Sequence, residues 1–280
     1  GNFAKNPRYQ GSGSSRINPY KLVSVYDAFV AANVNFTYAD GYGEHEVEVN
    51  EALINEAVEV AKNADVVLIC AGLPESYEVE GYDRNSLDMP PSHSALIEKI
   101  SAVNPKVVVI LSTGSPVTMP WLSKVKGVLL THLAGSATGL GTYNLVFGKK
   151  TPSGKLAETY PLSLAQSVPG RAFFESELNV PYLESIYVGY RYYDTFNKQV
   201  LFPFGYGLSY TQFKLSDHDI RVIDDKYIVS LNITNIGHLP GAEVISVFIS
   251  REFSKLFSPR KELKAFTKVY LEPGEKKSVE

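Results

Sequence analysis

Three short runs of mostly consecutive apolar residues constrain the fold of this chain most: VVLIC (66–70), KVVVIL (106–111) and GVLLT (127–131). None of them alternates apolar with polar residues, so each predicts a strand that is buried on both faces of a sheet. Amphipathic patterns typical of helices lie before and between the runs, at residues 22–29, 53–61 and 96–103. Buried strands separated by helices predict an α/β fold, a mostly parallel layered sandwich over residues 1–165.

The last part of the chain has a different pattern, in which apolar and polar residues alternate. The clearest predicted strands are YIVSLNITN (227–235), AEVISVFIS (242–250) and ELKAFTKVYL (262–271), joined by the turn signals NIGHLPG and EPGE. Short alternating strands at this spacing predict a β-sandwich over residues 213–280. Four or five strands fit before Glu280, so we expect an incomplete sandwich.

Aromatic residues are dense in the connector between these two parts, residues 166–212, within RAFFES, YVGYRYYDTF and FPFGYGLSYTQF. One interpretation is a sugar-stacking surface, because aromatic rings bury their apolar faces and keep a polar edge in water. The other is a connector whose rings pack on the α/β domain. We favour packing because the segment joins two domains.

Composition and charge exclude several classes of function. The chain has 27 Lys and Arg against 30 Asp and Glu, so it has no basic surplus for binding nucleic acid or an anionic membrane. The single cysteine, Cys70, lies in an apolar run and predicts no disulfide. No run reaches the ~18 apolar residues of a membrane span, and no signal peptide is visible, which favours a cytoplasmic location. Because the chain begins at Gly1 rather than Met, we expect its natural amino terminus to lie upstream.

Several catalytic and cofactor motifs are missing or incomplete. The five histidines are scattered, without HxxxH spacing or a Cys/His pairing that would predict zinc. The loop QGSGSS (10–15) lacks the lysine of a phosphate-binding loop and the GxGxxG spacing of a dinucleotide site, although its free backbone N–H groups suit a polar site. The segment STGSPV around Ser115 does not fit the GxSxG turn of an acyl-transfer serine. We therefore expect no metal and no nucleotide cofactor.

An acidic loop remains as the candidate site: YEVEGYDR (77–84), with Glu75 just before it. The loop follows the strand predicted at 66–70, and ligands of parallel α/β sheets bind beyond the carboxyl ends of the strands. Two prolines and Ser92, the predicted N-cap of the next helix, anchor it downstream. Its position predicts a functional edge of the sheet.

Two carboxylates of this loop, Glu78 and Glu80, suit acid and base chemistry. They are two residues apart, so in extended structure they share a face and each disfavours ionisation of the other. Glycoside hydrolysis requires such a protonated acid together with a second carboxylate. A short acidic loop is also often simply solvated, and the residues alone leave both interpretations open.

At this point the sequence resembles the family 3 glycoside hydrolases, mainly β-glucosidases. Six segments match the family in family order: GNFAKNPRYQGSGSSRINP, AGLPESYEVEGYDRNSLDMP, VVVILSTGSPVTMPW, LAGSATGLGTYNLVFGKKTPSGKLAETYP, YVGYRYYD and FPFGYGLSYTQF. The resemblance implies a retaining β-glucosidase in which a (β/α)8-like barrel carries an aspartate nucleophile. The other parts are an α/β sandwich, which carries the acid/base glutamate, and a fibronectin type III-like domain, and no metal or organic cofactor is used. This chain would supply only the last two parts, so it would depend on a missing barrel and be inactive alone.

The resemblance also assigns residues within the acidic loop. Many members place the acid/base glutamate four residues before the arginine of a DR pair, which corresponds to Glu80; in members with longer loops, Glu78 or Glu75 would take the role. It further implies that Asp83 and Arg84 support the loop as an ion pair.

Tyr82 is the remaining candidate of the loop, and we expect it to pack there or to contact substrate. The implied partners are a β-glucoside or oligosaccharide substrate and the missing barrel, with no nucleic acid and no membrane. The competing hypotheses are a non-catalytic carbohydrate-binding or interaction module and a nucleotide-dependent α/β enzyme. The second of these is disfavoured by the incomplete phosphate motif.

Overall fold

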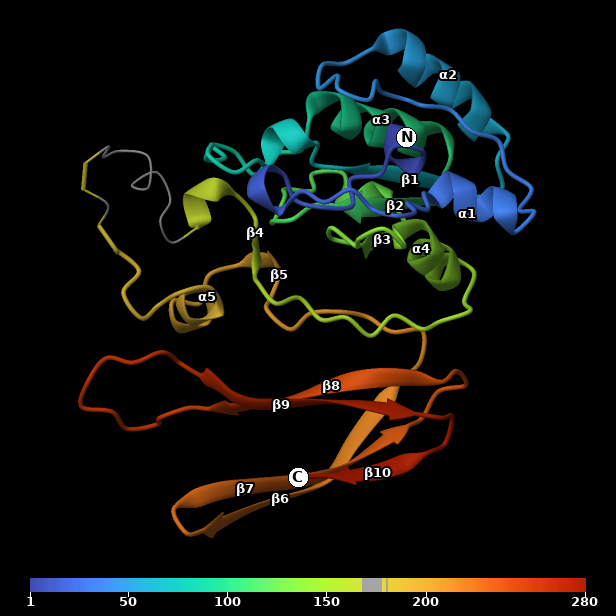
Figure 1. Ribbon diagram of the computed structural model, residues 1–280. Coiled ribbons are helices and arrows are strands. Elements are labelled where there is room, and N and C mark those ends of the chain that lie inside the picture. Colours follow the sequence, from blue (N-terminus) through green and yellow to red (C-terminus); the bar gives the residue numbers. More distant parts are fainter. Residues whose placement is uncertain (168–177, 180) are drawn as a thin grey trace. The chain divides into compact units, whose positions relative to one another are not determined.

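The structure is a computed structural model that describes residues 1–167, 178–179 and 181–280 (Figure 1). These residues form two compact units, 1–146 and 147–280, which we describe separately. The aromatic segment RAFFES lies outside the described residues. A division into three parts, with boundaries near 165 and 212, remains a prediction.

A parallel three-stranded sheet forms the centre of the first unit. Its strands are β1 (Val67–Gly72), β2 (Val107–Ser112) and β3 (Gly127–Leu130), in the order β1-β2-β3. Val67 pairs with Val107 and Val108 pairs with Gly127, so all three strands run in the same direction. The three apolar runs are therefore strands, and the predicted parallel α/β architecture is confirmed.

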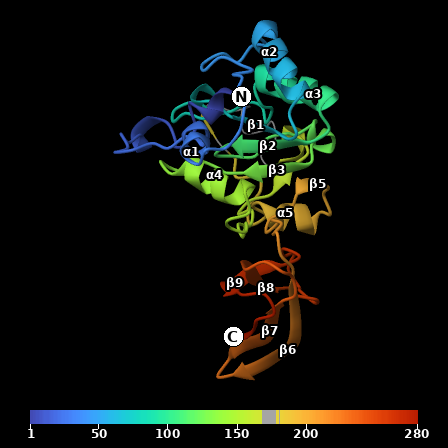
Figure 2. The ribbon, with the colours of Figure 1, turned by 90° about the vertical axis from the view of Figure 1, so that its right-hand side faces the viewer.

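Helices cover this sheet. They are α1 (Val25–Ala31), α2 (Glu51–Lys62), α3 (Pro91–Val103) and α4 (Thr138–Val146). In Figure 2, α2 and α3 lie on one side of the sheet and α1 and α4 on the other. The core between them contains the fully buried side chains of Ile54, Ile69, Leu96, Ile97, Val109, Leu111 and Trp121.

Helix α3 begins two residues earlier than the sequence predicts. We expected Ser92 as the N-cap, but the N-cap is Pro90 and Pro91 is the first helical residue. Proline suits that position because its missing N–H would have no partner within the helix. Ser92 instead lies inside the first turn, where its backbone N–H donates to Val47 O at 3.0 Å.

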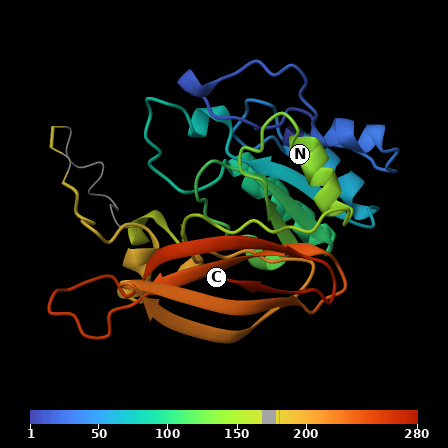
Figure 3. The same ribbon diagram turned by 60° about the horizontal axis from the view of Figure 1, so that its bottom comes forward.

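The second unit contains five longer strands in two antiparallel sheets (Figure 3). They are β6 (Phe213–Ile223), β7 (Lys226–Asn235), β8 (Gly241–Ile249), β9 (Glu262–Leu271) and β10 (Lys276–Val279). The sheet orders are β10-β7-β6 and β8-β9. One apolar core joins both sheets, because Leu231 and Ile233 of β7 cluster with Ile245 of β8 and with Val269 and Leu271 of β9. The predicted β-sandwich is confirmed.

Aromatic packing dominates the described part of the connector. The rings of Tyr190 and Phe204 stack with their centroids 4.7 Å apart, and Phe248 meets both edge-on, at 5.8 and 6.4 Å. Tyr190 opens the short helix α5 (Tyr190–Thr195), while β4 (Tyr160–Pro161) pairs with β5 (Val200–Phe202). These rings pack against one another and against β8 within the second unit. That the connector packs on the α/β domain remains a prediction.

Over the described ranges, the longest helix has 13 residues, and none is long and apolar enough to cross a membrane. The same ranges contain no cluster of His, Cys, Asp and Glu side chains with the geometry of a metal site.

Candidate functional site

The acidic loop lies at the carboxyl end of β1, as the sequence predicts. It starts with a 3-10 turn, Glu75–Tyr77, and runs on toward α3. Hydrogen bonds join it to two other segments of the first unit: the loop that follows β2, residues 113–116, and the amino-terminal loop, residues 8–14. The site is therefore built from three segments that are far apart in the sequence.

Glu78 is tightly held, with a side chain that is only 12% exposed. Its Oε2 accepts a hydrogen bond from the backbone N–H of Gly114 at 2.8 Å, and its Oε1 accepts one from the hydroxyl of Ser115. Arg84 Nη1 lies 4.0 Å from the same Oε1. Both carboxylate oxygens of Glu78 thus have partners within the protein.

Arg84 lies on the other side of the loop and contacts the same segment. Its Nη1 donates to Ser115 Oγ at 2.6 Å and to Pro116 O at 3.1 Å. Arg84 forms an ion pair with Glu78, and Asp83, which the resemblance names as its partner, is exposed. Arg84 therefore supports the loop by linking it to the segment after β2.

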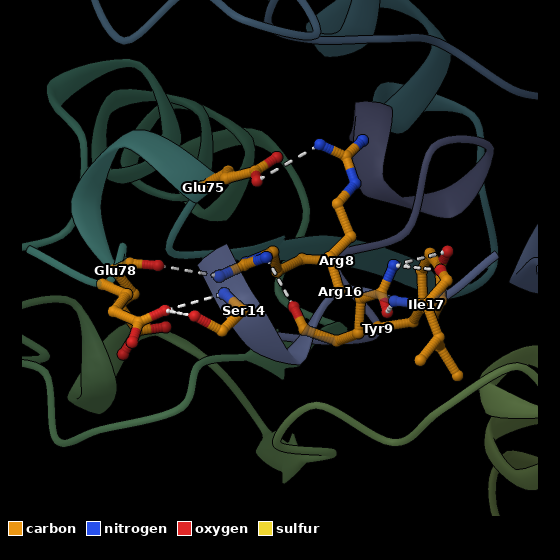
Figure 4. Close-up of polar contacts among 9 residues, drawn as sticks. Arg8, Tyr9, Ser14, Arg16, Ile17, Glu75 and Glu78 are labelled. Carbon is orange, nitrogen blue, oxygen red and sulfur yellow. Dashed lines mark hydrogen bonds and ion pairs between the residues drawn. The ribbon is translucent and has the colours of Figure 1, made fainter. Parts of the chain in front are cut away.

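Arg8 holds the loop from the amino-terminal side (Figure 4). Its Nη2 donates to the backbone oxygen of Glu78 at 3.0 Å, and its Nη1 donates to Gln10 O. Burial lowers the pKa of Arg8, and the nearby charges of Glu78 and Glu75 partly oppose this shift. Because Arg8 binds the Glu78 carbonyl, Glu78 is fixed through its backbone as well as its side chain.

Glu80 has a different environment, because its carboxylate is fully exposed apart from one partner. That partner is Ser14, which donates to Glu80 Oε2 from its backbone N–H at 2.7 Å and from its hydroxyl at 2.6 Å. These two hydrogen bonds stabilise the ionised form and lower the pKa of Glu80. Gly13 permits the approach, since a Cβ at this residue would lie 2.5 Å from the same oxygen.

Glu75 and Tyr82, two further candidates of the loop, are also exposed. Glu75 forms a surface ion pair with Arg16, with 3.7 Å between Oε1 and Nη1 (Figure 4), and its side chain is 50% exposed. Tyr82 is 81% exposed, so its ring is available for contact with a ligand. The loop therefore offers one largely enclosed carboxylate, that of Glu78, and exposed carboxylates at Glu75, Glu80 and Asp83. An exposed carboxylate is able to exchange a proton with a bound molecule.

Sequence reasoning did not assign a role to four residues that shape this site: Arg8, Ser14, Gly114 and Ser115. For Ser14, Gly114 and Ser115 the only signal was the small, polar composition of QGSGSS and STGSPV, which we compared with other motifs, and Arg8 lies outside both segments. Their partners lie 36 to 70 residues away in the chain, so sequence spacing does not reveal these contacts.

Comparison with known proteins establishes the family. Residues 1–210 match the family model described as "Glycosyl hydrolase family 3 C-terminal domain", and residues 243–280 match "Fibronectin type III-like domain". The chain belongs to glycoside hydrolase family 3. The resemblance noted from the six segments is thereby confirmed.

Two curated relatives of this family 3 chain illustrate its range. It is 44% identical to "Thermostable beta-glucosidase B" of Acetivibrio thermocellus, over the whole chain and 38% of the relative. It is 42% identical to the "Exo-alpha-(1->6)-L-arabinopyranosidase" of Bifidobacterium breve, over the whole chain and 37% of that protein. The chain thus spans little more than a third of the length of these relatives, and family members of similar identity carry different substrate names.

Solved structures agree with the fold. A family 3 β-glucosidase of Bifidobacterium adolescentis matches with a TM-score of 0.96 and 40% identity, over the whole chain and 41% of that protein. A β-glucosidase of Kluyveromyces marxianus, solved in complex with glucose, matches with a TM-score of 0.77 and 40% identity, over 82% of this chain and 28% of that one. The family 3 chain covers less than half of each of these two structures.

Proposed function

We propose that this chain is the acid/base-bearing part of a retaining family 3 β-glucosidase that releases terminal β-linked glucose. In this proposal Glu80 is the general acid/base, and the aspartate nucleophile belongs to a barrel domain outside this chain. The similarity to β-glucosidases along the whole chain supports the substrate class. The chain alone then lacks the covalent route and shows no meaningful turnover.

The contrast between Glu78 and Glu80 carries the assignment. An acid/base must reach the glycosidic oxygen and must gain and lose a proton during each cycle. Glu78 is surrounded by Gly114, Ser115 and Arg84, and both of its oxygens are engaged. Glu80 is exposed, and among the described residues its hydrogen-bond partner is Ser14, so it is the carboxylate that a substrate is able to reach.

The proposed reaction has two steps. In the first, Glu80 gives its proton to the glycosidic oxygen while the nucleophile bonds to the anomeric carbon, and the leaving alcohol departs. In the second, the Glu80 carboxylate takes a proton from water as the water oxygen attacks the anomeric carbon and the nucleophile is released. The proton returns to Glu80, so the site ends each cycle as it began.

The contact with Ser14 sets a condition on this role. Two donors favour the ionised form of Glu80, whereas the first step needs the protonated form. We therefore propose that Glu80 separates from Ser14 when it engages the leaving group. The exposed ring of Tyr82, two residues further along, is placed in this proposal against the leaving group, where an aromatic face stacks on a sugar.

A second candidate substrate class is supported by a specific similarity. Two Bifidobacterium proteins named exo-α-(1→6)-L-arabinopyranosidases are 42% and 41% identical to this chain over its whole length. In this proposal the same acid/base chemistry acts on both substrates, because the sugar ring is bound by the barrel domain outside this chain. Parallel assays with p-nitrophenyl β-D-glucoside and p-nitrophenyl α-L-arabinopyranoside separate the two.

The test of Glu80 uses the full-length protein that carries this chain. Glu80→Gln is expected to lower kcat/KM by about 10²- to 10⁴-fold on substrates with poor leaving groups, and far less on 2,4-dinitrophenyl glycosides. Glu80→Ala is expected to regain turnover of activated substrates with azide, which replaces water without needing a base. Equal losses on good and poor leaving groups, with no azide effect, would contradict the assignment.

A further inference from the structure

We propose that Glu78 is a positioning residue for the acid/base: it acts with Arg84, Gly114 and Ser115 as a clamp that closes the base of the acidic loop and so determines where Glu80 lies. We call these four residues the loop clamp. This inference rests on the proposed role of Glu80 and adds to it a residue that touches no substrate.

The carboxylate of Glu78 lies where three donors converge. Gly114 N–H donates to Oε2 at 2.8 Å, the Ser115 hydroxyl donates to Oε1, and Arg84 Nη1 approaches Oε1 to 4.0 Å. Charge-assisted hydrogen bonds to an ionised carboxylate are about twice as strong as neutral ones. The low exposure of both charged side chains, 12% and 16%, strengthens the attraction further.

The segment after β2 is shaped for this carboxylate. A Cβ at Gly114 would lie 3.3 Å from both oxygens of Glu78, which is closer than ordinary van der Waals contact. Ser115 contacts both sides of the clamp, because its hydroxyl donates to Glu78 and accepts from Arg84 at 2.6 Å. The loop after β2 thus links Glu78 to Arg84 through the hydroxyl of Ser115.

The clamp flanks Glu80. Glu78 and Arg84 bracket residues 79–83, which we call the loop tip and which contain Glu80. The tip is lightly held: Glu80 binds Ser14, Tyr82 is exposed, and a Cβ at Gly81 would meet nothing within 4 Å. The clamp therefore fixes both ends of the tip, and Ser14 holds the Glu80 carboxylate within it.

Loss of the clamp is expected to impair proton transfer specifically. In Glu78→Gln the amide nitrogen places a donor against Gly114 N–H or Ser115, and the pair with Arg84 loses its negative charge. A displacement of about 1 Å costs a positioned reaction about a hundredfold. We therefore expect kcat on poor leaving groups to fall by about ten- to a hundredfold, with KM and the rate on 2,4-dinitrophenyl glycosides nearly unchanged.

The acidic loop itself provides a matched control. Glu75→Gln removes the same charge three residues earlier, where the carboxylate pairs with Arg16 on the surface. This variant is expected to keep the wild-type dependence on the leaving group. Ser115→Ala is the milder second clamp variant: it removes one hydroxyl that serves both Glu78 and Arg84, and it keeps the charges in place.

The full-length enzyme is the material for this test, with thermal unfolding measured for every variant. The proposal is supported if Glu78→Gln and Ser115→Ala both lose activity on poor leaving groups only, without rescue by azide in Glu78→Ala. If Glu78→Gln shows the same dependence on the leaving group as Glu75→Gln while Glu80→Gln keeps its expected defect, the positioning role of Glu78 is refuted and the role of Glu80 stands. If azide rescues Glu78→Ala and not Glu80→Ala, Glu78 is the acid/base and both proposals are overturned.

Discussion

Ser14 donates two hydrogen bonds to a single oxygen of Glu80, one from its backbone N–H at 2.7 Å and one from its hydroxyl at 2.6 Å. The two residues are separated by 66 positions in the chain, so the amino-terminal loop acts directly on the acidic loop. Because both donors favour the carboxylate over the carboxylic acid, Ser14 influences when Glu80 carries a proton.

We predict that Ser14→Ala moves the alkaline limb of the kcat/KM profile to higher pH. The hydroxyl lowers the pKa of Glu80, so removing it raises that pKa, and the acid remains protonated further into the alkaline range. The profile is measured on the full-length enzyme, with Ser15→Ala as the control in the same loop. A limb that stays in place or moves to lower pH would show that Ser14 does not act on the acid.

Gly13 is predicted to be intolerant of any side chain. Its φ of +81° costs an alanine about 1–2 kcal/mol of stability, and a Cβ there would lie 2.5 Å from Glu80 Oε2 and 2.6 Å from Glu80 Cβ. Gly13→Ala should therefore lower thermal stability and also displace Glu80, with a loss of about a hundredfold in kcat on poor leaving groups. Gly148→Ala is the matched control, because Gly148 has a φ of +67° and open space around it. If both variants lose only stability, Gly13 does not set the position of Glu80.

His93 is predicted to make the stability of the first unit pH-dependent. Its ring is 2% exposed, its Nδ1 lies 2.9 Å from Gly72 O, and burial lowers its pKa to about 3 from 6.5. Above about pH 6.5 the histidine is neutral in both the folded and the unfolded chain. Between about pH 6.5 and 3 it is protonated in the unfolded chain and neutral in the folded chain. Stability is then lost by about 1.4 kcal/mol for each pH unit as the pH falls toward 3.

The measurement for His93 is the free energy of denaturant unfolding at pH 7.5 and 5.5. In this chain it is followed by the fluorescence of Trp121, the single tryptophan, which is buried in the same unit. His93→Gln should reduce the loss of stability between the two pH values, whatever its effect at pH 7.5. His45→Gln should leave that loss unchanged because the His45 side chain is 92% exposed. An equal loss in the wild type and in His93→Gln would refute the prediction.

The central sheet was predictable from sequence, and the physical reason is its burial. A strand covered on both faces needs apolar residues at every position, which sets it apart from both helices and half-exposed strands. Helix α4 was not predicted, because Gly139 and Gly141 each cost a helix about 1 kcal/mol relative to alanine. The structure explains Gly139: a Cβ there would lie 2.0 Å from Ser24 O, so the glycine permits α4 to approach α1 closely. Tertiary packing outweighs local propensity at this helix.

The candidate site was predictable in part. Strand topology alone placed the acidic loop at the carboxyl end of a sheet strand, and the structure confirms that position. The different environments of Glu78 and Glu80 were not predictable, since they depend on Gly114 and Ser115 for one residue and on Ser14 for the other. Two glutamates separated by one valine carry no local signal of which will be enclosed.

The short span between Glu78 and Arg84 has a consequence for how enzymes of this kind diversify. Glu78 and Arg84 both bind the hydroxyl of Ser115. The number of residues between them is therefore able to change while these two attachment points stay in place. Doubling the length of a flexible loop costs only about 0.6 kcal/mol of closure entropy. Insertions or swaps between these two residues are therefore a practical route to altering which aglycones are accepted, with the scaffold beneath left intact.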